Sequence, residues 1–283
     1  YLEKYINVFP NPKALETCQD RLFEKNLFSK LDISTTKYKN ISNENELKDA
    51  LEEFGSNSII KSRRFGYDGK NQIVVSNLSA EDIWKKSGKN LSIIENKIKF
   101  KKKLSLIGVR TNSKKIFFYP LVENNHKDGI LNTSIAPYED ELKQKEAENI
   151  LSKIMKELNY IGVLVIEFFL DENNNLIANE MAPRVHNSGH WTIEGANISQ
   201  FEAHIRAISG LDIESIYAKG YSAMINLISK MPKKEKFNSD TDIHFYDYGK
   251  EERNKRKLGH VTINQSNLNS LNQKLEYLKN KIS

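Results

Sequence analysis

The chain is poor in the features that define several protein classes. Cys18 is the only cysteine among its 283 residues, which excludes an internal disulfide and a zinc site built from several thiolates. The longest apolar stretch, residues 161–170, contains Glu167 and is too short to cross a bilayer. Residues 1–10 lack the pattern of a signal peptide, and no repeat or low-complexity segment is present. These absences predict a globular protein of the cytoplasm without a membrane partner.

The charge balance of the chain is basic. Lys and Arg number 43 and Asp and Glu number 37, so the net charge is +6. Such an excess raises the question of nucleic-acid binding, but lysines gather in two short clusters, at 99–103 and 250–257, and Glu251 and Glu252 offset part of the second. Short clusters are more typical of a solvated face or of a small anionic ligand. We therefore expect no nucleic-acid partner.

The hydrophobic pattern predicts a mixed chain of helices and strands over a length that corresponds to about two domains. Asn11 and Pro12 are a favourable N-cap and first-turn pair, and Gly210 is a favourable C-cap. The expected helices cover residues 12–30, 139–158, 199–209 and a final segment with Leu268, Leu271, Leu275 and Leu278. The expected strands cover residues 58–62, 91–95, 104–111, 116–119, 161–170, 176–180, 223–228, 243–246 and 261–263.

The strands at 161–170 and 176–180 are joined by an Asn-rich turn, which predicts an antiparallel hairpin. Pairing across this turn places Glu167 almost opposite Glu180. Opposed like charges destabilise a strand pair, so a positive group should lie between them. It is either a hard cation such as Mg²⁺, which prefers carboxylate oxygens, or a Lys or Arg beside each Glu. Asn179 adds an oxygen ligand and favours the metal slightly.

A second candidate site is the segment 61–70, where a buried strand that ends in Lys61 leads into a loop containing Gly66 and Gly69. Backbone amides exposed by glycine can hold phosphate together with fixed cations. The spacing is not that of a P-loop, and a basic surface hairpin has the same composition. Both interpretations remain open on these residues alone.

A third candidate site follows the carboxylate strand directly, in the segment 179–191. Pro183 and Gly189 prevent a continuous helix, so His186 and His190 lack the spacing of a zinc-protease helix. This argues against a zinc hydrolase that uses His186, His190 and Glu180. The segment offers several hydrogen-bond donors to an anion: Arg184, His186, Asn187, Ser188 and His190.

These residues resemble one family closely, the 5-(carboxyamino)imidazole ribonucleotide synthases of PurK type, which are ATP-grasp ligases of purine synthesis. The most specific match is the run from Asn179 to Thr192, continued by residues 199–202. Supporting motifs in the family order occur at 20–22, 66–69, 119–121, 126–130 and 257–260. The resemblance implies an α+β ATP-grasp fold, with a small lid subdomain, a larger antiparallel-sheet subdomain and a small C-terminal subdomain.

The resemblance also implies how the chain is divided. Residues 1–32 would be a linker and helix, residues 33–95 the lid, residues 96–215 the main subdomain and residues 216–283 the C-terminal subdomain. The family begins with a Rossmann-like domain that nothing here matches. Because the chain starts with Tyr1 and not with Met, we expect that domain to lie before Tyr1. The family also implies a homodimer.

The implied reaction is the phosphorylation of bicarbonate by ATP, followed by capture of the carboxyl group by aminoimidazole ribonucleotide. The cofactors would be ATP and Mg²⁺, with Glu167 and Glu180 as metal ligands. The implied catalytic residues are Asp68, Arg184 and His186. The residues implied for ATP are Arg21, Lys61, Gly66, Tyr67, Gly69, Gln72, Glu95, His126 and Asn179. The residues implied for bicarbonate and the ribonucleotide are Tyr67, Asp68, Arg184, His186, Asn187, Ser188, Arg256 and Lys257.

The chain departs from the family pattern on the nucleotide side. Lys103 stands where the family usually has a Glu that accepts hydrogen bonds from the ATP ribose, and lysine has no acceptor. Asn71 replaces a glycine of the lid loop, and Asn96 and Lys97 replace Gln and Gly after the hinge. These departures favour an alternative interpretation, a degenerate ATP-grasp module that binds nucleotide without turnover.

Overall fold

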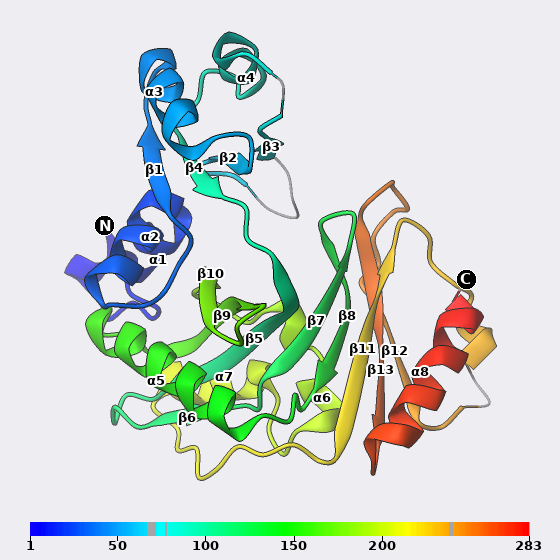
Figure 1. Cartoon of the computed structure of the whole chain (residues 1–283). Helices are drawn as coiled ribbons and strands as arrows, with labels where there is room; N and C mark the ends of the chain where they lie inside the picture. Colours follow the sequence, from blue (N-terminus) through cyan, green and yellow to red (C-terminus); the bar gives the residue numbers. More distant parts are fainter. Residues whose placement is uncertain (67–71, 77, 238–239, 283) are drawn as a thin grey trace.

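The structure is a computed structural model that describes residues 1–66, 72–76, 78–237 and 240–282. In this described part, the strands form two sheets, of four and nine strands, and every ladder between named strands is antiparallel. Figure 1 shows the small sheet above the large one, with the N-terminal helices beside the connection between them. The implied α+β architecture is therefore confirmed.

The small sheet has the strand order β1-β4-β2-β3. Its core is formed by apolar side chains such as Ile60 and Ile94 from the strands and Leu47 and Ile83 from two helices. Packing of one face of a sheet against helices is what a two-layer α/β unit requires. Its elements are β1 (Tyr38–Ile41), α3 (Glu44–Phe54), β2 (Ser58–Ser62), β3 (Gln72–Val74), α4 (Ala80–Lys86) and β4 (Ser92–Asn96).

The large sheet has the order β10-β9-β5-β7-β8-β11-β13-β12, with β6 paired to β5. Along β9, Leu164 and Ile166 pack in the core that contains α5, whereas Val163 and Val165 pack in the core that contains α7. Because neighbouring side chains of a strand point to opposite faces, Glu167 lies on the face opposite α5. The elements of this part are β5 (Phe100–Arg110), β6 (Ile116–Phe118), β7 (Val122–Lys127), β8 (Ile130–Ala136), α5 (Glu141–Glu157), β9 (Gly162–Asp171), β10 (Leu176–Ala182), α6 (Thr192–Gly195) and α7 (Gln200–Ser209).

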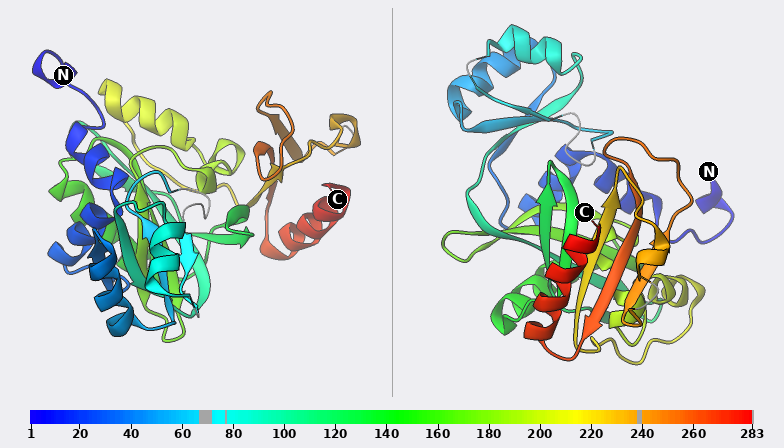
Figure 2. Two further views of the ribbon diagram at one scale, coloured as in Figure 1. Left: turned by 90° about the horizontal axis from the view of Figure 1, so that it is seen from above. Right: turned by 90° about the vertical axis from the view of Figure 1, so that its right-hand side faces the viewer.

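The C-terminal segment extends the large sheet. Strand β11 (Tyr221–Ile228) pairs with β8 on one side and with β13 (Lys257–Gln265) on the other, and β12 (Ile243–Asp247) forms the edge. Helix α8 (Leu268–Ile282) covers one face of these strands, as the right-hand view of Figure 2 shows. Its expected stripe is confirmed at Leu271, Leu275 and Leu278, which are buried.

The single helix expected over residues 12–30 is wrong. The structure has two helices, α1 (Pro12–Gln19) and α2 (Arg21–Lys30), that break at Asp20. Asp20 is extended, and its side chain accepts a hydrogen bond from the Leu22 N–H as the N-cap of α2. Aspartate favours caps over helix interiors because its carboxylate satisfies free backbone N–H groups. The expected cap by Asn11 is confirmed, since its side chain accepts from Ala14 N–H.

The other expected elements are present, with ends that differ by a few residues. Seven of the described strands and α-helices were not predicted: β1, α3, β3, α4, β7, β8 and α6. Strand β7 reads Val-Glu-Asn-Asn-His-Lys, which carries little of the apolar alternation that marks a strand. Among the described residues, no helix is long and apolar enough to cross a membrane.

Candidate active site

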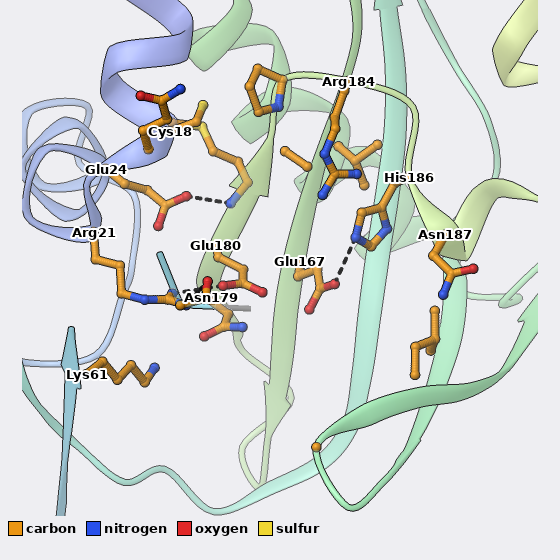
Figure 3. Close-up of a pocket in the computed structure, with 18 of the residues that line it drawn as sticks. Cys18, Arg21, Glu24, Lys61, Glu167, Asn179, Glu180, Arg184, His186 and Asn187 are labelled. Carbon is orange, nitrogen blue, oxygen red and sulfur yellow. Dashed lines mark hydrogen bonds and ion pairs between the residues drawn. The ribbon is translucent and has the colours of Figure 1, made fainter. Parts of the chain in front are cut away.

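A cavity of about 690 Å³ lies between the small sheet, helix α2 and one face of the large sheet. Figure 3 shows its residues: Arg21 and Glu24 come from α2, Glu167 and Glu180 from the β9–β10 hairpin, and His186 from the loop that follows. The cavity therefore collects side chains that are far apart in the sequence. All three candidate sites of the sequence contribute to it.

The two carboxylates are brought together by a bulge in β10. Ala178 pairs with Phe168, but the next pair is Glu180 with Glu167, so Asn179 is the extra residue. A bulge lets two consecutive residues oppose one residue of the partner strand. This explains why Asn179 and Glu180 both line the cavity, which regular alternation would prevent. The predicted opposition of the two glutamates is confirmed.

The two carboxylates differ in their partners. Arg21 Nη1 lies 2.8 Å from Glu180 Oε2, whereas the nearest basic side chain of Glu167 is His186, with Nε2 at 3.4 Å from Oε1. Burial, and then the charge of Glu180, raise the pKa of Glu167 to about 8. Burial also acts on Glu180, but the charge and the hydrogen bond of Arg21, together with the charge of Lys61, outweigh it and lower the pKa of Glu180. The negative charge of Glu180 is therefore compensated by Arg21, whereas that of Glu167 is poorly compensated.

This donor set fits a magnesium ion that also binds phosphate. Mg²⁺ is commonly held by one or two carboxylates while substrate phosphates and water complete its shell. Glu167, Glu180 and the Asn179 amide supply oxygen ligands of this kind at one place on the cavity wall. The described residues contain no cluster of three His, Cys, Asp or Glu side chains that could hold a metal alone. The alternative of an Arg partner is realised at Glu180 only.

A buried charge network lies where the small sheet meets the large one. Lys61 Nζ and Lys25 Nζ lie 3.1 Å and 3.6 Å from Glu95 Oε2, and Thr36 Oγ1 donates to the same oxygen. Burial alone would raise the pKa of Glu95, but Lys25 and Lys61 outweigh it and lower the pKa to about 2. Glu95 is therefore a fixed anion at the connection between the sheets.

Lys103 is a further cation of the cavity wall. Its ammonium lies 5.7 Å and 5.6 Å from the ring centres of Phe100 and Phe169, distances typical of cation–π contacts. Burial lowers the pKa of Lys103, and the nearby charges of Glu167 and Glu180 act in the opposite direction. The family pattern has a carboxylate at this position. Lys103 places a positive charge there instead, facing the glutamate pair.

The loop after β10 forms the other side of the cavity. Arg184 is exposed, His186 and Asn187 are partly buried, and all three line the cavity. Burial, and then the charge of Arg184, lower the pKa of His186 to about 3, so its imidazole is neutral. Among the described groups, the Asn187 Nδ2 atom is buried without a hydrogen-bond partner. Ser188 is fully buried behind His186 and bonds to its ring.

The remaining predicted residues fall into three groups. Gly66, Gln72, His126 and Lys257 line the cavity. Arg256 lies next to Lys257 at the start of β13, where its Nη1 donates to the Glu251 carbonyl. Tyr67, Asp68 and Gly69 lie outside the described residues, as does Asn71.

Two buried groups of α2 were missed by the sequence reasoning. The Glu24 carboxylate accepts a hydrogen bond from the Met181 N–H at 2.6 Å, next to Glu180. Lys25 Nζ donates to Thr35 Oγ1 and to the Ala178 carbonyl. Their helical spacing from Arg21, at i+3 and i+4, was the available signal.

His190 does not line the cavity. Its ring stacks on Phe201 and on His260 instead.

Comparisons with known proteins agree with this geometry. Residues 26–201 match the model of the ATP-grasp domain, and residues 222–274 match that of the phosphoribosylaminoimidazole carboxylase C-terminal domain. The N5-carboxyaminoimidazole ribonucleotide synthase of Pseudomonas aeruginosa is 40% identical over 264 residues, which span 93% of this chain and 73% of the relative.

Solved structures give the same result. The N5-carboxyaminoimidazole ribonucleotide synthetase of Thermus thermophilus superimposes with a TM-score of 0.93 at 40% identity and covers 100% of this chain and 77% of its own. The Aspergillus clavatus enzyme in complex with ADP and 5-aminoimidazole ribonucleotide gives a TM-score of 0.89 at 26% identity, over 99% of this chain and 78% of its own. This chain therefore belongs to the family of N5-carboxyaminoimidazole ribonucleotide synthases, which are ATP-grasp ligases.

Proposed function

We propose that this chain carboxylates 5-aminoimidazole ribonucleotide with bicarbonate at the expense of ATP, as a step of purine synthesis. The observation that carries the proposal is the opposed pair Glu167 and Glu180, which lies between the cations Arg21 and Lys103 and the donors of the loop 184–187. A site of this kind can hold a polyphosphate beside a small anion. The names of the relatives and their ADP complexes support the same reaction.

The reaction has two steps that balance. A bicarbonate oxygen attacks the γ-phosphorus of ATP, and ADP leaves to give carboxyphosphate. The exocyclic amine of the ribonucleotide then attacks the carboxyl carbon, the C–O bond to phosphate breaks, and the amine loses a proton. The product is a carbamate, N5-carboxyaminoimidazole ribonucleotide. In such phosphoryl transfers, the protein contributes mainly positioning and charge stabilisation.

Glu167, Glu180 and Asn179 would hold Mg²⁺ on the ATP phosphates. When bound, the ion neutralises phosphate charge during transfer. Because the pKa of Glu167 is about 8 in the structure, a cation at this place would favour the ionised carboxylate. The metal would thus relieve the repulsion that the hairpin creates.

On the nucleotide side, Arg21, Lys61 and Lys103 would face the phosphates or the ribose, since all three line the cavity. The loop from Gly66 to Gln72, including Tyr67 and Gly69, would close over the nucleotide and keep water from carboxyphosphate. Glu95 would stand at the adenine hinge, and His126 near the phosphates. The basic character of this wall suits a bound polyphosphate.

On the other side, Arg184, His186 and Asn187 would bind bicarbonate and the ribonucleotide, with Tyr67 and Asp68. The Asn187 Nδ2 group is a buried donor that a ligand oxygen could satisfy. Arg256 and Lys257 would bind the 5′-phosphate of the ribonucleotide. Ser188 would act behind His186, because its hydroxyl is fully buried.

An alternative is a module that binds nucleotide without turnover, and the observation that favours it is Lys103. Phosphate release from ATP, measured with and without bicarbonate and 5-aminoimidazole ribonucleotide, separates the two. We expect release that requires Mg²⁺ and increases strongly with both substrates. Nucleotide binding without substrate-dependent release would instead support the binding module. A homodimer in the cytoplasm is part of the proposal and is tested by light scattering and by cell fractionation.

A further inference from the structure

A chain of buried polar side chains runs through the large sheet to His186. Ser134 Oγ lies 2.7 Å from Asn124 Oδ1, Asn124 Nδ2 lies 2.8 Å from Ser105 Oγ, and Ser105 Oγ lies 2.9 Å from Ser188 Oγ. Ser188 Oγ lies 2.8 Å from His186 Nδ1. The three serines are 0% exposed and Asn124 is 4% exposed. These residues come from β8, β7, β5 and the loop after β10.

Burial of three polar side chains in the sheet and a fourth in the loop beside it is unfavourable unless each finds a partner. Ser105, Asn124 and Ser134 do not line the cavity themselves. Among the described contacts, these side chains connect to the cavity only through Ser188, which contacts the ring of His186. This arrangement suggests that they control the orientation of the His186 imidazole and the position of its hydrogen.

The direction of the chain is fixed at its His186 end. The backbone N–H of Ser188 donates to His186 Nδ1 at 3.3 Å, so Nδ1 carries no hydrogen. The Ser188 hydroxyl must then donate to Nδ1, because two acceptors cannot form a hydrogen bond. With its only hydrogen used, Ser188 accepts from Ser105, Ser105 accepts from the Asn124 amide, and the Asn124 carbonyl accepts from Ser134.

A neutral imidazole without hydrogen on Nδ1 carries it on Nε2. That nitrogen is the one that lies 3.4 Å from Glu167 Oε1 (Figure 3), and His186 lines the cavity. The Nε2–H group is therefore presented to the site as a donor. It cannot accept a proton there without first losing its own.

We propose that Ser105, Asn124, Ser134 and Ser188 form a positioning network that locks His186 in the Nε2–H tautomer, so that His186 serves the reaction as a hydrogen-bond donor and not as a general base. The donor would meet an oxygen of bicarbonate or carboxyphosphate. This inference rests on the proposed function, because it gives His186 a part in that reaction. Groups that orient a ligating or reacting imidazole commonly act in this way.

The first test is the tautomer itself, observed by long-range ¹H–¹⁵N NMR on protein with ¹⁵N-labelled histidine. The His186 signals are assigned by their loss in His186→Gln. We expect a protonated Nε2 and an unprotonated Nδ1 in the wild type. In Ser188→Ala we expect a measurable Nδ1–H population, because the variant loses the hydroxyl donor at 2.8 Å and keeps only the longer backbone N–H contact at 3.3 Å. Protonated Nδ1 in the wild type, or an unchanged tautomer in Ser188→Ala, would overturn the proposal.

The second test is kinetic and uses Ser105→Ala and Ser188→Ala. Loss of such an orienting partner typically costs about 10- to 100-fold in activity, so we expect kcat to fall by at least about tenfold while KM for ATP changes less than about twofold. Ser222→Ala is the matched control, because Ser222 is 0% exposed and accepts from the Asn264 amide at 2.8 Å in the same sheet. Wild-type kcat in both variants would overturn the network. The NMR test does not depend on enzyme activity. A wild type that shows no carboxylation would therefore refute the proposed function without deciding the tautomer of His186.

Discussion

Glu167 and Glu180 are the residues on which the proposed chemistry depends. Their opposition was predicted from a turn centred between Asn173 and Asn174. In the structure the regular ladder from the turn ends at Ala178, and the bulge that follows it is what places Glu180 opposite Glu167. The partner of Glu180, Arg21, was not predictable from spacing, because 159 residues separate the two in the chain. Tertiary packing of α2 against β10 creates that ion pair.

We expect Glu180→Gln to abolish Mg²⁺-dependent turnover and to leave the fold intact. The variant loses both the attraction of Arg21 and the repulsion of Glu167, so the unfolding midpoint should change little. Phosphate release at increasing Mg²⁺ and thermal unfolding measure the two effects. Glu172→Gln, which removes an exposed carboxylate at the tip of the same hairpin, is the control. Full activity of Glu180→Gln would refute the metal assignment.

Glu24 predicts a pH dependence of stability. Burial, and then the charge of Glu180, raise its pKa to about 8, so the folded protein binds this proton more tightly than the unfolded chain does. Stability from this group is fully present below the ordinary glutamate pKa and is lost as the pH rises through about 8. We expect the unfolding midpoint to fall less between pH 6 and about pH 9 in Glu24→Gln than in the wild type. The Gln carbonyl can still accept from the Met181 N–H.

The exposed carboxylate of Glu16 on α1 offers a control for that experiment. Glu16→Gln should retain the wild-type dependence on pH. Identical pH profiles for Glu24→Gln and the wild type would contradict the assignment of a shifted carboxyl to Glu24.

Lys103 tests the nucleotide side of the site. Its ammonium is held over Phe100 and Phe169 and faces the glutamate pair. We expect Lys103→Met to raise KM for ATP by about tenfold, because a charge-assisted hydrogen bond contributes about 1.5 kcal/mol or more, with a smaller effect on KM for the ribonucleotide. Lys101→Met is the control, since Lys101 is exposed and bonds to Asn174. An unchanged KM for ATP would place Lys103 outside the nucleotide site.

At the scale of elements, apolar periodicity predicted most strands of the large sheet and its helices. It is weak in β7, which was missed, but it is present in α3, where Leu47, Ala50 and Phe54 form a buried stripe that the sequence reasoning overlooked. The β9–β10 hairpin was predictable because ten apolar-rich positions and an Asn-rich turn define it. The bulge at Asn179 was not, because it depends on how two strands pair and not on the residues of one strand. The break at Asp20 was missed because the apolar stripe continues across it, although the cap chemistry of aspartate was visible.

The junction of the two sheets depends on Glu95 at the end of β4. It is the anion that Lys25 of α2 and Lys61 of β2 share. We expect Glu95→Gln to lower the free energy of unfolding by about 3 kcal/mol, because removal of one partner leaves buried positive charge uncompensated. Chemical denaturation measures this, and Glu53→Gln, which removes an exposed carboxylate of α3, serves as control. Equal losses of unfolding free energy in Glu95→Gln and Glu53→Gln would contradict a stabilising role of Glu95 at the junction.

At the scale of the molecule, the architecture brings one cavity together from two sheets. The family resemblance predicted this fold and most of the polar and charged side chains that line the cavity, because short motifs such as residues 179–192 were matched in order along the chain. It did not predict that β11, β13 and β12 continue the large sheet. Nor did it predict the buried chain from Ser134 to His186, which no local pattern marks since its members lie on separate strands.

The central claim is that bicarbonate is activated by phosphoryl transfer in this cavity, and ¹⁸O-labelled bicarbonate tests it most directly. The chain is incubated with ATP, Mg²⁺, 5-aminoimidazole ribonucleotide and labelled bicarbonate, and the released phosphate is analysed by mass spectrometry. Because a bicarbonate oxygen bridges to phosphorus and remains there when the amine displaces phosphate, we predict one ¹⁸O atom in each phosphate released. Unlabelled phosphate, released at the same rate without the ribonucleotide, would contradict the account.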